Sequence, residues 1–251
     1  MQVILHDVFY NNDNITTVVI PDSVITIGNS AFNGCDRLSS VVIGNSVTTI
    51  GDFAFAECHN LTSIVIPDSV TTIDDCAFSL CSSLSSVVIG NGVTSIGQSA
   101  FEYSENIIDV YISDVAKWCT IKFEGYTSNP LLHAKNLYVN NVLVTELVIP
   151  EGVTAIGNDA FGNCDSFTSV VVPDSVTTIG EHAFSNCSKL SSVVIGNSVT
   201  SIGDYAFAWC DNLKNVYYTG SKEEWLSITF GLVNWSLTGA TRIYNYVPGN
   251  N

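Results

Sequence analysis

Hydrophobic positions recur along this chain with a fixed spacing of 23 residues. An alanine followed by a phenylalanine marks the period most clearly: Phe32, Phe55, Phe78 and Phe101 are each 23 residues apart, and the spacing resumes at Phe161, Phe184 and Phe207. Columns of valine, isoleucine and cysteine keep the same spacing, with Ser104 once replacing the cysteine. This period predicts a solenoid, because a repeat of this length buries its apolar face only by stacking on its neighbours.

Within a repeat, the pattern predicts two short extended segments joined by a tight turn. Ser40 and Val42 alternate with Val41 and Ile43, which indicates a strand with the second pair facing the core. A Pro-Asp or Gly-Asn pair then marks the turn, and a second short strand runs back. The Ala-Phe-x-x-Cys segment is predicted as one helical or 3₁₀ turn, since its three apolar residues share a face at that spacing.

The repeats are organised in two blocks, each followed by a longer irregular unit. We expect one solenoid over residues 1–251, made of an N-terminal segment (1–14), four 23-residue repeats (15–106), a long repeat (107–143), three 23-residue repeats (144–212) and a long C-terminal capping repeat (213–251). The long units resemble each other and hold Trp118, Trp225 and Trp235. We expect these tryptophans to plug the core at the end of a block. The alternative is a protruding lip that contacts a partner.

Composition and charge restrict the classes of partner that the chain is expected to bind. The formal net charge is −16, from 24 acidic against 8 basic side chains, which argues against nucleic acid as a partner. No apolar run reaches the roughly 18 residues of a membrane helix, so no membrane insertion is expected. The start, MQVILHDVFYNNDN, lacks the basic region of a secretory signal. The chain therefore either stays inside the cell or has lost a leader and anchor.

The sequence offers no catalytic, cofactor or metal set. Six of the eight cysteines form one column, Cys35, Cys58, Cys81, Cys164, Cys187 and Cys210, and we expect buried free thiols there. Cys76 falls in a different column and is expected to be half-exposed. In the turn column Glu151 and Asp174 fall on adjacent repeats. That pair is interpreted as a solvated turn, with a cation site as the alternative.

The repeat unit L-x-S-V-V-I-P-D-S-V-T-x-I-G-x-x-A-F-x-x-C resembles the BspA-like, or TpLRR, class of leucine-rich repeats. The resemblance covers residues 15–106 and 144–212. It implies an α/β fold: a right-handed, strand-rich horseshoe solenoid with a parallel sheet on the concave face and short strands with 3₁₀ or helical turns on the convex side. It also implies a non-enzymatic bacterial protein, on the cell surface or secreted, that acts in adhesion or protein contact.

The outward positions of the first strand make the candidate concave contact strip. It consists of Ser40, Val42, Ser63, Val65, Ser86, Val88, Asp109, Tyr111, Glu146, Val148, Ser169, Val171, Ser192, Val194, Asn215 and Tyr217. A contiguous row of exposed valines indicates an interaction surface, although such residues also simply stabilise sheets. We therefore expect a protein partner. The alternatives are a glycan bound at exposed Trp209, Trp225 and Trp235, or a passive spacer within a longer protein.

Overall fold

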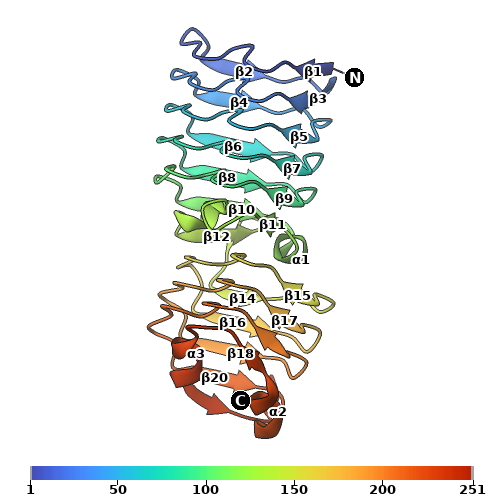
Figure 1. Ribbon diagram of the computed structural model, residues 1–251, viewed down its shortest axis with the longest axis vertical. Coiled ribbons are helices and arrows are strands. Elements are labelled where there is room, and N and C mark those ends of the chain that lie inside the picture. The colour runs from blue at the N-terminus through green and yellow to red at the C-terminus, as the bar shows by residue number, and fades with distance from the viewer. Residues whose placement is uncertain (1, 250–251) are drawn as a thin grey trace. The chain divides into compact units, whose positions relative to one another are not determined.

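The computed structural model describes residues 2–249, which divide into two compact units. Unit 1 comprises residues 1–114 and 121–142, and unit 2 comprises residues 115–120 and 143–251. Figure 1 shows strands stacked rung on rung in both units, with little helix. The predicted solenoid is thus confirmed, whereas the horseshoe curvature stays a prediction.

Each unit has two rows of strands, which we name the strip sheet and the return sheet by their role. On the strip side of unit 1, β2 (Thr17–Val19) and β4 (Ser40–Val42) form a two-stranded sheet, and a second sheet has the order β6 (Ser63–Ile66), β8 (Ser86–Ile89), β10 (Asp109–Ile112), β12 (Asn136–Val139) and β13 (Val142–Leu143). We call these strands together the strip sheet of unit 1. The return sheet is β1 (Gln2–Ile4), β3 (Val24–Ile27), β5 (Thr49–Ile50), β7 (Thr72–Ile73), β9 (Ser95–Ile96) and β11 (Lys122–Phe123). Pairing joins residues 23 apart, such as Ser63 and Ser86.

Unit 2 repeats this arrangement. Its strip sheet is β14 (Glu146–Val148), β16 (Ser169–Val172), β18 (Ser192–Ile195), β20 (Asn215–Tyr218) and β22 (Thr241–Ile243), and its return sheet is β15 (Ala155–Ile156), β17 (Thr178–Ile179), β19 (Ser201–Ile202) and β21 (Thr229–Phe230). The helices of the chain are short: α1 (Val115–Cys119), the 3₁₀ turn η1 (Pro130–Leu132), α2 (Lys222–Ser227) and α3 (Trp235–Gly239). Within residues 2–249, no helix has the length and apolar character needed to cross a membrane.

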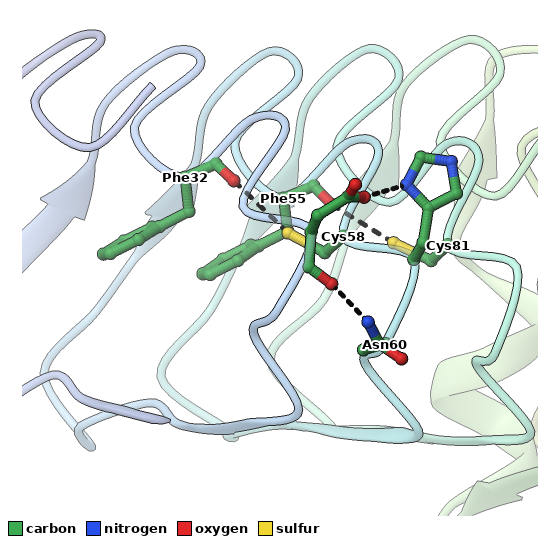
Figure 2. Close-up of polar contacts among 7 residues, drawn as sticks. Phe32, Phe55, Cys58, Asn60 and Cys81 are labelled. Carbon is green, nitrogen blue, oxygen red and sulfur yellow. Dashed lines mark hydrogen bonds and ion pairs between the residues drawn. The ribbon is translucent and has the colours of Figure 1, made fainter. Parts of the chain in front are cut away.

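The core consists of the predicted columns. Phe32, Phe55 and Phe78 are buried, and their rings stack at centroid distances of 5.1 and 5.4 Å. The six cysteines of the predicted column, which we call the ladder cysteines, are buried beside the phenylalanines. Cys76 is half-exposed, as predicted. Figure 2 shows the thiol of Cys58 donating to the carbonyl oxygen of Phe32 in the preceding repeat, at 3.2 Å. Ring stacking and this hydrogen bond therefore tie the Cys58 repeat to its preceding neighbour, and Cys81, Cys187 and Cys210 make the same bond.

The first residues of the chain already take part in this stack. Strand β1 pairs with β3, with Ile4 opposite Ile27. The ring of Phe9 stacks on Phe32 at 5.1 Å. Ile4 and Phe9 each lie 23 residues before their partners, so residues 1–14 contain the second half of a repeat.

The helical turn predicted for the Ala-Phe-x-x-Cys segment is wrong. These residues form successive turns in which Phe53 and Glu57 have φ values of 54° and 58°. Alternate N–H groups point to the next repeat, and that of Phe55 donates to Ala77 O at 2.8 Å. A helix would need those donors for its own carbonyls. The three apolar side chains are nevertheless buried together.

The expectation that the tryptophans of the long units plug the core is confirmed for two of the three. Trp118 of α1 is buried and its indole N–H donates to Ala160 O at 2.6 Å, so it packs at the first rung of unit 2. Trp225 of α2 is buried against Tyr218 in the last rungs. Trp235 is 54% exposed, so the prediction that it plugs the core is wrong.

Candidate binding surface

The predicted strip lies on the outer side of the two strip sheets. In β4 and β6 the side chains of Val41 and Ile64 face the core, whereas Val42 and Val65 are exposed, Val65 by 56%. All sixteen strip residues are exposed or half-exposed. Those from Ser40 to Tyr111 belong to unit 1 and those from Glu146 to Tyr217 to unit 2, so the structure presents two strips of equal construction.

A pair of tyrosines ends each strip. Tyr111 stacks on Tyr138, with ring centroids 4.5 Å apart and an interplanar angle of 14°. Tyr217 contacts Tyr246 at 4.7 Å with an angle of 45°. The second partner of each pair was absent from the sequence-based strip. Tyr138 could have been found, because it lies opposite Tyr111 in neighbouring strands.

The contact of Tyr246 with Tyr217 could not be predicted by aligning the sequences of the two long units. Their shared endings align Tyr244 with Tyr138. The register of β22 differs by one residue, which puts Ile243 opposite Tyr217. Tyr244 then contacts Trp225 instead. Tyr246, two residues further along, takes the place beside Tyr217.

The exposed valines form the floor of a groove in each unit. The groove of unit 1 encloses about 640 Å³ and is lined in part by Val42, Val65, Val88 and Tyr111. Asn140 also lines this groove.

The groove of unit 2 has the same floor and a different wall. It encloses about 470 Å³ over Val148, Val171 and Val194. Tyr246 and Pro248, from the segment after β22, complete its lining.

The Pro-Asp and Gly-Asn turns make one rim of each groove. The carboxylate of Asp68 accepts a hydrogen bond from the backbone N–H of Asn91 in the next repeat, at 2.7 Å. In unit 2, Asp174 accepts from the N–H of Asn197 at 2.9 Å and from the hydroxyl of Thr219 at 2.7 Å. These bonds hold the carboxylates in place along the rim.

The structure does not support the alternative that Glu151 and Asp174 bind a cation at this rim. One oxygen of Asp174 already accepts two hydrogen bonds. Among residues 2–249, no group of three or more His, Cys, Asp or Glu side chains is placed to hold a metal ion. Glu151 lines the groove as an exposed carboxylate.

Aromatic side chains also gather on a second exposed surface of unit 2, formed by the turns that carry the buried phenylalanines. The rings of His182 and Tyr205 stack at 4.9 Å, and Tyr205 stacks on Trp209 at 5.8 Å. Trp209 meets Trp235 edge to face at 6.3 Å. Trp225 is only 3% exposed, so its predicted place in an exposed glycan site is wrong.

Comparisons with known proteins agree with this architecture. A family model described as a BspA type leucine rich repeat region matches in six copies, over residues 2–128 and 134–236. No curated protein sequence matches the chain significantly.

Solved structures of bacterial leucine-rich repeat proteins are also similar to this chain. A leucine rich cell surface protein from Faecalibacterium prausnitzii is 27% identical, covering 91% of this chain and 86% of its own, with a TM-score of 0.42. The T. pallidum leucine rich repeat protein is 23% identical over 85% and 72%, with a TM-score of 0.45. A leucine-rich repeat protein from Eubacterium ventriosum is 22% identical over 84% and 61%, with a TM-score of 0.50, and shares the fold.

Proposed function

The chain belongs to the BspA-type leucine-rich-repeat family, and on that premise we propose that it is a non-enzymatic module that binds a protein partner through its outward strips. The observation that carries the proposal is the row of exposed valines on each strip sheet, which ends at a tyrosine pair. Contiguous exposed apolar surface marks interaction sites, and tyrosine is a frequent energetic anchor in them.

The strips are also well suited to binding because they are held rigidly. Each strip side chain stands on a strand that pairs with its neighbours, as Val171 does opposite Val194. The layer beneath is fully buried, as Val170 and Val193 are. A surface fixed before binding loses little conformational entropy when a partner docks.

A location on the bacterial cell surface or outside the cell is part of the proposal. It rests on the family alone, whose resemblance implies adhesion or contact with other proteins. The acidic net charge of −16 is compatible with an exposed and well-solvated surface.

Carbohydrate binding is the second candidate, and one observation favours it. Trp209 and Trp235 are both about half-exposed and lie edge to face beside Tyr205. Exposed tryptophans present apolar faces to the C–H groups of sugar rings. A glycan array with the intact chain and with Trp209→Ala tests this idea, and an array without signal removes it.

The proposed function is tested by partner capture. The intact chain and a Tyr111→Ala/Tyr217→Ala variant are immobilised, and the proteins each retains from host and bacterial extracts are quantified. Both tyrosines are half-exposed, so the variant is expected to fold. Loss of specific partners from the variant is the expected result, and an unchanged set of partners would overturn the proposal.

A further inference from the structure

We propose that the chain carries two equivalent peptide-binding grooves, one in each unit, and that each accepts an extended segment that alternates basic and aliphatic side chains. This inference rests on the proposed function and goes further, because it states the chemistry of the partner and the number of sites. It follows from the construction of the grooves, from their charge and from their length.

The two grooves have the same floor. Counted back from the long unit, Val88 corresponds to Val194 and Val65 to Val171. In both units the strand of the long unit follows directly, and a second tyrosine contacts its tyrosine, stacked in unit 1 and tilted by 45° in unit 2. Two surfaces built alike from the same repeat should bind the same kind of segment.

Both rims carry only negative charge. The charged side chains that line the grooves are Asp68 in unit 1 and Glu151 and Asp174 in unit 2. No Lys, Arg or His occurs among the described residues that line either groove. Complementary charge selects partners and speeds their encounter, so a lysine or arginine of the partner would lie along this rim.

The apolar floor requires aliphatic side chains between those basic ones. Burying Val42, Val65 and Val88 lowers the free energy of the complex only if the partner covers them with apolar groups. In an extended segment, successive side chains point to opposite sides, so one set can face the valines. The other set points away from the floor, and its long, flexible basic side chains bend over to reach the rim.

The length of the floor sets the length of the segment. From Val42 to Tyr111 the groove crosses four neighbouring strands, which at about 4.8 Å per strand gives roughly 14 Å. An extended chain advances about 3.3 Å per residue, so the groove of unit 1 holds about five residues. The floor of unit 2 crosses three strands from Val148 to Val194, roughly 10 Å, and holds about four.

The charge also excludes a second copy of this chain as the favoured occupant. With 24 acidic and 8 basic side chains, the molecule repels its own kind at neutral pH. The partner is therefore a different protein with a basic and aliphatic segment.

The test is calorimetric titration of the full chain with an end-capped pentapeptide, Lys-Val-Lys-Val-Lys, at low salt. We expect two peptides per chain, and no binding of the acidic counterpart Glu-Val-Glu-Val-Glu. Val65→Lys and Val171→Lys each put a positive charge on one floor, so each should lower the stoichiometry from two to one. The double variant should bind none.

Val19→Lys is the matched control. Val19 occupies the same outward column and is 73% exposed, but it does not line the groove. This variant should still bind two peptides. Retained thermal unfolding would show that all the variants fold.

Several results would overturn the inference: one peptide per chain, equal binding of the acidic peptide, or the same loss in Val19→Lys as in Val65→Lys. Failure of the peptide to bind, while the Tyr111→Ala/Tyr217→Ala variant still loses its captured partners, would overturn this inference alone. Unchanged capture by that variant would overturn the proposed function instead.

Discussion

At the scale of the residue, the cysteine column is explained by one hydrogen bond. The thiol of Cys81 donates to Phe55 O at 3.1 Å, as that of Cys58 does to Phe32 O. Where serine replaces cysteine, the hydroxyl of Ser104 makes the equivalent bond to the phenylalanine carbonyl of the preceding repeat, at 2.8 Å. The column therefore requires a small buried donor, and the ladder thiols act as donors in the core.

Thiol reactivity tests this assignment. Burial raises the pKa of Cys58, and it raises the pKa of Cys81 to about 12, so the reactive thiolate is scarce at neutral pH. In the native protein we expect the half-exposed Cys76 to react first with a thiol reagent and the ladder to react only after unfolding. In denaturant all eight thiols should be counted. A count well below eight would show that disulfides had formed.

The phenylalanine column should dominate stability. Phe78 is fully buried between Phe55 and Phe101, with ring centroids 5.4 Å from each. Phe78→Ala removes these contacts and leaves a cavity, so chemical denaturation should show a loss of about 3–5 kcal/mol. The control is Phe53→Ala at a 44% exposed site, with a change of about 0.5 kcal/mol or less. A loss below about 1 kcal/mol in Phe78→Ala would mean that the column is not core.

At the scale of the element, the glycines of the Gly-Asn turns are explained by how closely neighbouring turns approach. A Cβ added to Gly90 would lie 2.6 Å from the backbone carbonyl atoms of Pro67 in the preceding repeat. Gly44 and Gly196 approach Pro21 and Pro173 in the same way. At these three positions a side chain would overlap the preceding proline turn, whereas Pro173 follows the Pro150 turn without a glycine.

Gly90→Ala should therefore destabilise unit 1. The added methyl group would overlap backbone atoms that cannot rotate away, and overpacking of this kind costs about 1–3 kcal/mol. Gly239→Ala is the control, because no atom lies within 4 Å of its Cβ position. Thermal unfolding of both variants is the measurement, and equal midpoints would contradict the packing explanation.

The elements show what the sequence could predict and what it could not. The strands and buried columns followed from the 23-residue period, because identical repeats must face one another. The Ala54–Cys58 segment was predicted as a helical or 3₁₀ turn, since periodicity reports which side chains are buried and not where the backbone N–H groups point. The place of Tyr246 was missed because a register shift of one residue in β22 breaks the match between the long units.

At the scale of the whole molecule, the same rung produces two different surfaces in each unit. The strip side offers valines such as Val65 and an acidic rim, and the opposite turns offer separate side chains such as Leu80 and Trp209. The sequence predicted the strip residues, because strand alternation fixes which side chains point outward. The grooves depend on the turns and the long units, whose irregular backbone follows no repeat.

The most direct test of the account compares these two surfaces in one capture experiment. The wild-type chain is immobilised beside Val65→Lys/Val171→Lys on the strip and Leu80→Lys/Trp209→Lys on the turns, since all four sites are exposed or half-exposed, and captured proteins are quantified by mass spectrometry. The account predicts that the strip variant loses the partners that the wild type and the turn variant both retain. Loss from the turn variant, with the strip variant unaffected, would contradict it.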